Sequence, residues 1–453
     1  MRLTDTLSGR KEPFAPAGDE VLMYVCGVTP YAASHIGHAM SYIVFDVLRR
    51  YLEFSGHRVR HVQNFTDIDD KLIDRARLSG TSVKELAERH IADYFREMDA
   101  LNVTRATVYP RATEEMPQII EMVQGLIEKG FAYRAGGDVF YRVRKKAGYG
   151  ALKHQSLDEL VAGARIEIDE QKEFAGDFAL WKGAKAGEPA WESPWGAGRP
   201  GWHIECSAMS LRYLGPQIDI HGGGEDLIFP HHTNEIAQTE AFTGKEPFVR
   251  FWVHNAHLRL DDEKMSKSLG NILSLRDALD RWGADALRVF VLTSHYRSPL
   301  NASDEGLDAA KRGAERLAGA AHVISAGSAG RAVDPMPFRA RFVEGMDDDL
   351  NTPQALAALH ELAREINRGR DEGAEVAAAQ AALRELGSVL GLGFAQSSAG
   401  NREAAPFIDL LVEVRRELRS AKQWALADQI RDRLAGLGVA LEDSAQGTTW
   451  RPL

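Results

Sequence analysis

Two histidines three residues apart, His35 and His38, stand at the start of a long apolar helical pattern, HIGHAMSYIVFDVLRRYL. The first N–H groups of a helix lack partners within the helix, and with the helix dipole they attract an anion. Imidazole N–H groups donate hydrogen bonds without a permanent charge, and Gly37 lets a flat base approach the backbone. The stretch therefore indicates a phosphate site, although the residues alone also fit two surface histidines with no role.

A second polar segment, EKMSKSLGN, places Lys264 and Lys267 with two serines just before a glycine. Such a segment suits a mobile loop that clamps phosphates, but by itself it also fits a solvated lysine loop. The chain has no GxxxxGK[ST] signature, and the triple glycine of GGGEDL lacks the GxGxxG spacing. If the protein binds ATP, the helix start and the lysine segment must hold its phosphates.

A third group of residues could bind a metal ion. His231 and Glu235 are four residues apart in FPHHTNEIAQ, a spacing that puts both on one helical face. Cys26, at the end of an apolar strand pattern, and Cys206, in WHIECSAM, would complete a Cys₂HisGlu site, for which zinc is the suitable metal. By spacing alone, His232 is as well placed as His231, and the two cysteines also fit inert buried thiols.

The elements that must position these residues start with a strand, a helix and a strand over 21–26, 37–54 and 59–65. This order predicts a parallel βαβ unit with ligands at the carboxyl ends of the strands. Helical periodicity, a hairpin around Gly136 and an insertion rich in Gly, Pro and Trp follow, before an apolar helix (CSAMSLRYL), a strand (QIDIH), a glycine loop (GGGEDL) and a helix from His231.

After about residue 300 strands are not expected, and the remaining chain is predicted to form a helical bundle and then a small C-terminal unit. Helical spacing recurs over 303–325, 351–369, 373–391, 405–420 and 423–437. In 411–434, basic side chains alternate with Trp424, which fits phosphate contacts plus base stacking or a solvated helix pair. The basic residues are Arg415, Arg416, Arg419, Lys422 and Arg431.

The chain totals restrict the class of protein. A length of 453 residues predicts about three domains, and no apolar run approaches the ~20 residues of a membrane helix. The net charge of −10 argues against broad nonspecific nucleic-acid binding, so any such partner should meet a local basic face. The polar start, MRLTDTLSGRKEP, has no signal-peptide pattern, and we expect a cytoplasmic protein.

From MYVCGVTPY onward, the chain resembles the cysteinyl-tRNA synthetases. HIGH followed by KMSKS is the signature pair of class I aminoacyl-tRNA synthetases, and further blocks such as VQNFTDIDDKLIDRA, DIHGGGEDLIFPHHTNEIAQ and ADQIRDRLAGLGVALEDSAQGTTW extend the resemblance over nearly the whole chain. It implies a Rossmann-like catalytic domain with a connective insertion, an α-helical bundle and an anticodon-binding unit. The expected bounds are 1–110 with 201–257 (catalytic), 111–200 (insertion), 258–300 (KMSKS loop and stem-contact region), 301–395 (bundle) and 396–453 (anticodon binding).

The resemblance implies ATP-dependent activation of L-cysteine to cysteinyl-adenylate and transfer to the terminal adenosine of tRNA(Cys), by a chain that is a monomer. Its zinc ligands correspond to Cys26, Cys206, His231 and Glu235, with one Zn²⁺ per chain and Mg²⁺ accompanying ATP. The expected catalytic residues are His35, His38, Lys264 and Lys267. ATP is expected near Gly37, Gly224 and Asp226, and cysteine near Thr29, Thr66, Trp202 and Asp226.

A related ligase of mycothiol biosynthesis joins cysteine to a glucosaminyl inositol by the same adenylate chemistry, and GVTPYAASHIGHA resembles its first motif more closely. That ligase lacks the glutamate at the fourth metal position and the synthetase-like tail, whereas this chain has Glu235 and a tail through Trp450. A noncatalytic tRNA-binding relative would have damaged motifs. A zinc hydrolase would need an open metal position and a general base, which the four-ligand set and the ATP loop argue against.

Overall fold

A four-stranded parallel sheet forms the centre of the structure, in the order β10-β9-β3-β4. Its strands are β3 (Glu20–Val25), β4 (Arg58–Gln63), β9 (Ile218–Gly224) and β10 (Val249–Asn255). The chain leaves β3 toward β4 on one side and reaches β9 on the other, so the end of β3 is a topological switch point, where open α/β sheets bind ligands. The computed structural model describes residues 1–163, 171–260, 263–264, 273–322, 331–394, 399–444 and 447–452.

Helix α1 (Ile36–Phe54) connects β3 to β4 and confirms the predicted βαβ unit. Its apolar side chains are buried against the sheet, Ile43 and Leu48 completely. The helix comes so close to β9 that a Cβ atom on Gly222 would lie 2.2 Å from Cε1 of Phe45. The triple glycine of GGGEDL is therefore part of strand β9, and the prediction of a glycine loop there is wrong.

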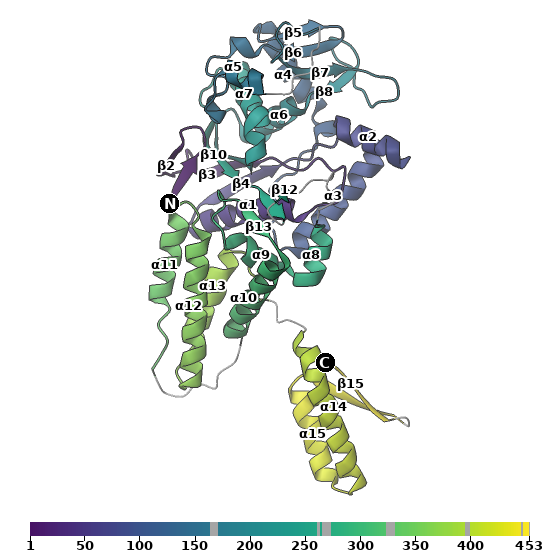
Figure 1. Cartoon of the computed structure of the whole chain (residues 1–453), viewed down its shortest axis with the longest axis vertical. Coiled ribbons are helices and arrows are strands. Elements are labelled where there is room, and N and C mark those ends of the chain that lie inside the picture. Colours follow the sequence, from purple (N-terminus) through teal and green to yellow (C-terminus); the bar gives the residue numbers. More distant parts are fainter. Residues whose placement is uncertain are drawn as a thin grey trace. The chain divides into compact units, whose positions relative to one another are not determined.

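The expected insertion contains an antiparallel sheet with the order β5-β6-β7-β8, which lies above the parallel sheet in Figure 1. The hairpin around Gly136 is confirmed as β5 and β6. The strands are β5 (Ala132–Ala135), β6 (Asp138–Tyr141), β7 (Phe178–Gly183) and β8 (Gly198–Pro200). The helices around the two sheets are α2 (Asp70–Ser79), α3 (Val83–Ala100), α4 (Met116–Glu128), α5 (Leu157–Gly163), α6 (Trp202–Leu214) and α7 (Thr233–Thr243).

Helices dominate the next part of the chain, below the parallel sheet in Figure 1. They are α8 (Leu275–Trp282), α9 (Ala284–Leu292), α10 (Asp304–His322), α11 (Met336–Asp347), α12 (Thr352–Asp371) and α13 (Ala377–Val389). Short strands accompany them, β11 (Leu258–Leu260), β12 (Glu263–Lys264) and β13 (Leu300–Ala302), and an N-terminal hairpin, β1 (Arg2–Asp5) and β2 (Arg10–Pro13), packs on β10.

The chain divides into a first unit, 1–394, and a second unit, 395–453. The second unit contains α14 (Ala399–Ser420), α15 (Trp424–Gly436) and an antiparallel hairpin of β14 (Val439–Ser444) and β15 (Gly447–Pro452). Together with β13, this hairpin shows that the expectation of no strands after residue 300 is wrong. The second unit's small core includes Ile408, Leu434 and Val439.

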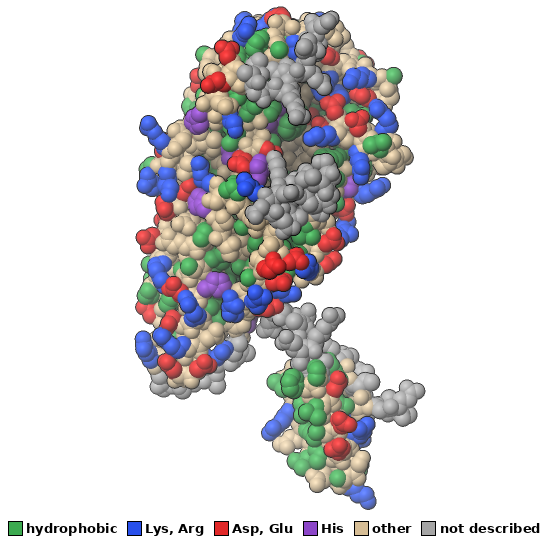
Figure 2. Space-filling view, viewed as in Figure 1, with side chains coloured by type: hydrophobic (Ala, Val, Ile, Leu, Met, Phe, Trp, Pro, Cys, Tyr) green, Lys and Arg blue, Asp and Glu red, His purple; other side chains and the backbone are tan. Residues whose placement is uncertain are grey.

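The second unit also corrects one predicted phosphate contact. Arg415 is only 2% exposed, and its Nη1 donates to Thr448 Oγ1 at 3.4 Å, so this guanidinium stabilises the unit's interior. Trp424 is 55% exposed, and the Arg419 guanidinium lies 5.8 Å from the centre of its ring. Figure 2 shows hydrophobic side chains gathered on one face of this unit.

Within the described ranges, no helix is long and apolar enough to cross a membrane.

Candidate active site and metal centre

The two cysteines come together at the switch point of the parallel sheet. Cys26 directly follows β3, and its backbone N–H donates to Gly222 O of β9 at 3.0 Å. Cys206 lies on α6, which packs against β3 and β4. The Cys26 thiol donates to Cys206, and the two Sγ atoms are 3.9 Å apart. Two residues 180 positions apart in the sequence are therefore in contact in the protein interior.

Two histidines and a glutamate complete this buried cluster. His231 and His232 lie in a single π-helical turn before α7, which carries Glu235. His231 Nε2 is 3.0 Å from Glu235 Oε1, and His232 Nε2 is 3.3 Å from Cys26 Sγ. Cys26, His231, His232 and Glu235 each offer a donor atom within 4.8 Å of the others. This set contains three of the four predicted ligands and adds His232; the fourth, Cys206, is not part of it, although its Sγ lies 3.9 Å from Cys26 Sγ.

The charges of the cluster suit a cation. Glu235 is completely buried, its ion-pair partners within the described chain are histidines alone, and burial raises its pKa well above the usual range. Burial lowers the pKa of His232 and keeps this imidazole neutral. The hydrogen bond from Cys26 lowers the pKa of Cys206 to about 7, whereas burial raises that of Cys26. Thiolate, imidazole and carboxylate donors without a fixed positive charge form a set that fits a zinc ion.

Two further histidines, His254 and His203, hydrogen-bond to the rings of His232 and His231. His254 Nε2 is 2.7 Å from His232 Nδ1, and its Nδ1 is 2.8 Å from Thr6 Oγ1. His203 Nδ1 is 3.0 Å from His231 Nδ1. Hydrogen bonds of this kind fix the ring orientation of metal-binding histidines. No local pattern in the sequence identifies these residues, because they are scattered between positions 6 and 254.

Trp202 and Thr66 lie at the rim of the cluster and at the neighbouring strand end. Trp202 begins α6, is 38% exposed, and stacks on His231 with ring centres 4.3 Å apart. Thr66 is buried just beyond β4, and its backbone N–H donates to Val28 O at 3.2 Å. A Cβ atom on Gly27 would lie 1.6 Å from Asn64 O, so only glycine allows the ends of β3 and β4 to approach this closely.

The remaining predicted substrate residues lie at the ends of β3 and β9. Thr29 follows β3 closely, and its carbonyl accepts from Tyr31 N at 2.9 Å. Gly224 is the last residue of β9, and Asp226 follows as the exposed residue of a 3₁₀ turn over Glu225–Leu227. Thr29, Gly224 and Asp226 thus lie at the carboxyl edge of the sheet.

The two signature histidines lie at the start of α1. The rings of His35 and His38 stack with centres 3.8 Å apart, and His35 N donates to His38 Nδ1 at 3.4 Å. The segment that follows the lysine motif returns to the same place, because Ile36 N donates to Leu273 O at 3.2 Å and Leu275 N to Ser34 O at 3.0 Å. The chain that follows the lysine motif is therefore hydrogen-bonded to the start of α1, next to the histidine pair.

Of the two lysines in the KMSKS motif, Lys264 belongs to the described residues and Lys267 does not. Lys264 ends the short strand β12, whose backbone pairs with Arg259 of β11. Lys267 and the two serines of the motif lie outside the described residues.

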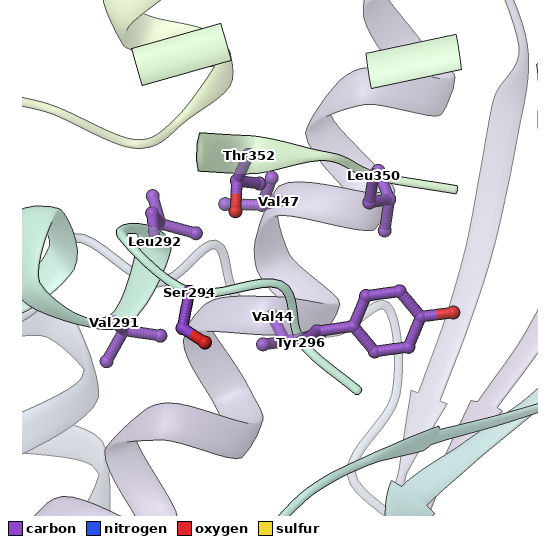
Figure 3. A pocket seen from close by; sticks show the side chains of 8 residues that line it. All are labelled: Val44, Val47, Val291, Leu292, Ser294, Tyr296, Leu350 and Thr352. Carbon is purple, nitrogen blue, oxygen red and sulfur yellow. The ribbon is translucent and has the colours of Figure 1, made fainter. Parts of the chain in front are cut away.

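A separate small pocket, drawn in Figure 3, lies between α1, the end of α9 and the segment before α12. It contains none of the predicted site residues. Its lining is Val44, Val47, Val291, Leu292, Ser294, Tyr296, Leu350 and Thr352.

The parallel sheet, the histidine pair at the start of its crossover helix and the KMSKS motif in the sequence define a class I aminoacyl-tRNA synthetase. The fold is similar to that of Mycobacterium tuberculosis methionyl-tRNA synthetase bound by methionyl-adenylate, with a TM-score of 0.61, 18% identity, and 82% of this chain and 89% of that chain covered. Three family models match: "tRNA synthetases class I (C) catalytic domain" over 14–312, "DALR domain" over 341–395, and "Cysteinyl-tRNA ligase anticodon binding domain" over 403–451.

Two full-length relatives specify the family. The chain is 57% identical over 454 residues to the cysteine–tRNA ligase of Dehalococcoides mccartyi (strain 195), covering 100% of this chain and 99% of that protein. It is 48% identical over 471 residues to the cysteine–tRNA ligase of Carboxydothermus hydrogenoformans, covering 100% of both. The chain belongs to the cysteine–tRNA ligase family.

Proposed function

We propose that the protein activates L-cysteine with ATP and transfers the cysteinyl group to the 3′ terminal adenosine of tRNA(Cys), and that a zinc ion in the buried cluster selects the cysteine thiol. The observation that carries this proposal is the convergence of two thiols, imidazoles and a buried carboxylate beneath Trp202 at the sheet's switch point. We further propose that the protein acts as a monomer in the cytoplasm.

The proposed zinc ligands are Cys26, Cys206, His231 and Glu235. His231 is preferred over His232 because it contacts Glu235 at 3.0 Å, against 3.9 Å for His232, and also hydrogen-bonds Cys206. A zinc ion bound by these residues would hold the substrate thiol as a thiolate, whereas the hydroxyl of serine stays protonated and binds weakly. Polar sites of this kind reject an analogue that lacks the recognised group by a factor of about 10⁴.

Around this centre, the side chains of the pocket orient the amino acid. Trp202 covers His231 and would pack on the bound cysteine side chain. Thr66 and Thr29, at neighbouring strand ends, and Asp226, at the end of β9, can accept hydrogen bonds from the substrate ammonium or the ribose. Gly224 lets the nucleotide approach the end of β9.

The chemical step places negative charge on the phosphates when the cysteine carboxylate attacks the α-phosphorus and pyrophosphate leaves. His35 and His38 would donate hydrogen bonds to these phosphates beside Gly37, and Lys264 and Lys267 of the KMSKS motif would bind the phosphates as well. Their contribution is stabilisation of charge in the transition state, with Mg²⁺ accompanying the ATP.

The second unit supports tRNA as the acceptor, because residues 403–451 match an anticodon-binding domain. None of the comparisons supports the alternative, a cysteine:glucosaminyl inositol ligase.

Cysteine-dependent ATP–pyrophosphate exchange, followed by charging of tRNA(Cys) or of glucosaminyl inositol, tests the proposal. We expect exchange with cysteine, at least 10³-fold less with serine, and charging of tRNA alone. Absence of exchange with zinc present would contradict the activation step, and acylation of the sugar alone would support the alternative. A Cys206→Ser variant should lose zinc and cysteine selectivity. If it keeps one zinc per chain and full selectivity, the metal assignment is wrong.

A further inference from the structure

The two cysteines of the metal centre have a second possible chemistry, because their sulfur atoms face each other. Cys26 Sγ and Cys206 Sγ are 3.9 Å apart, and the first donates directly to the second. A disulfide bond is about 2.05 Å long, so the sulfur atoms would have to move about 2 Å closer. Both residues are free thiols in the structure.

We propose that Cys26 and Cys206 form a site of reversible oxidation, at which a small hydroperoxide converts the two thiols into an intramolecular disulfide and removes both sulfur donors from the cluster. The sequence contains only these two cysteines, so neither has another partner within the chain.

The reaction balances with hydrogen peroxide as the oxidant. The first sulfur attacks the peroxide, the O–O bond breaks, and the products are a sulfenic acid and one water. The second sulfur then attacks the sulfenic sulfur, the S–S bond forms, and the hydroxyl leaves as a second water with the proton of the second thiol. Each sulfur loses one electron, and the two peroxide oxygens gain two.

The burial of the pair determines which oxidants reach it. Cys26 is 8% exposed and Cys206 is 2% exposed, and α6, β3 and the turn before α7 surround them. A molecule of the size of hydrogen peroxide can enter such a site, whereas a bulky disulfide such as oxidised glutathione cannot place its sulfur in line for exchange. The nearby second thiol should also trap the sulfenic acid before further oxidation.

Formation of the disulfide would leave His231, His232 and Glu235 as the metal-binding residues of the cluster. Their ligand atoms and the Cys26 sulfur all lie within 4.8 Å of one another. The proposal extends the proposed function, since loss of both sulfurs would remove the centre that recognises cysteine. It does not depend on that function, because the oxidation requires only the two thiols.

The test treats the full-length protein, stripped of zinc, with a small excess of hydrogen peroxide and measures intact mass and free thiols after denaturation. We expect the mass to fall by about 2 Da, free thiols to fall from two to near zero, and dithiothreitol to restore both. Tryptic mapping should show one peptide pair joining Cys26 to Cys206. A mass gain of about 32 Da, disulfide-linked dimers, or two remaining thiols would overturn the proposal.

Matched variants and a second oxidant complete the test. Cys26→Ser and Cys206→Ser each remove one partner, so the remaining thiol should gain oxygen and show no loss of 2 Da; far-UV circular dichroism checks that they fold. Oxidised glutathione should act at least tenfold more slowly than hydrogen peroxide, and an equal rate would contradict shielding of the pair by burial.

Zinc-loaded protein should react more slowly and release one zinc per disulfide. If zinc does not slow the oxidation, the assignment of the two cysteines as zinc ligands is wrong, whereas the proposed disulfide is not contradicted.

Discussion

Arg288 on α9 should be among the most important single side chains for the stability of the first unit. It is completely buried and pairs with Asp46 of α1. Its Nε donates to Leu101 O at 2.6 Å, and its Nη1 donates to Leu390 O at 2.9 Å, just after α13. One guanidinium thus connects α1, the end of α3, α9 and the chain that leaves the bundle.

The size of the effect follows from these contacts. Replacing Arg288 with Met leaves Asp46 with Arg50 as its remaining cationic partner and removes the Arg288 donors from two carbonyls, Leu101 O and Leu390 O. Removing one partner of a buried pair costs about 3–5 kcal/mol. Unfolding entropy is about 2.1 cal/mol/K per residue, which for the 394 residues of the first unit amounts to about 0.8 kcal/mol/K. The melting temperature should therefore fall by about 5 °C.

Calorimetry of purified Arg288→Met and a surface control measures this effect. The control is Arg339→Met, which breaks a bidentate but solvent-exposed pair with Glu385 and should change the free energy of unfolding by less than about 1 kcal/mol. Adding Asp46→Leu to Arg288→Met should restore part of the lost stability, because it removes the buried carboxylate that has lost its Arg288 partner. If Arg288→Met shifts the melting temperature no more than the control, the reasoning from burial is refuted.

Three further changes have defined outcomes. Burial lowers the pKa of His61 to about 3, so the folded protein resists protonation there; this contribution to stability is complete above pH 6.5 and is lost as the pH falls toward 3. In urea unfolding, the loss of stability between pH 8 and pH 5 should be about 2 kcal/mol smaller in His61→Leu than in the unchanged protein, and an equal loss in both would exclude His61 as a contributor. Gly222→Ala should cost about 1–3 kcal/mol and slow pyrophosphate exchange, because its Cβ would clash with the buried ring of Phe45, whereas Gly319→Ala, whose Cβ meets open space, should have no such effect. Trp202→Ala should raise the KM for cysteine about tenfold with an unchanged KM for ATP, while Trp202→Phe should keep most of the affinity; equal effects on both substrates would show a general disturbance of the fold.

Local periodicity predicted the elements that contact their neighbours through a simple apolar face. Helix α1 begins one residue from its expected start, since its buried positions repeat at helical spacing. The triple glycine of β9 was predicted as a loop because glycine is poor in strands, but Phe45 needs the space that Gly222 leaves. Helix α11 is not among the predicted helices, because it begins at the end of VISAGSAGRAVDPMP, a segment whose Gly, Ala, Ser and Pro content indicates a linker, and it packs against α12.

The metal centre shows a different limit of sequence reasoning. Cys26, Cys206 and Glu235 are so far apart along the chain that their spacing makes a weak zinc motif, and the resemblance to a family selects the set of ligands. Spacing also could not distinguish His231 from His232, and in the structure both present Nε2 toward the cluster. The supporting hydrogen bonds of His254 come from tertiary contacts, which leave no periodic trace in the sequence.

The central claim is that a zinc ion bound by Cys26, Cys206, His231 and Glu235 takes the substrate thiol as a further ligand. X-ray absorption at the zinc edge measures this most directly on the protein alone, with cysteine and with serine. We predict one zinc per chain with two sulfur neighbours at about 2.3 Å, a third sulfur when cysteine binds, and no change with serine. A sulfur number that does not rise with cysteine, or a protein purified with zinc that has no sulfur neighbour, would contradict the claim.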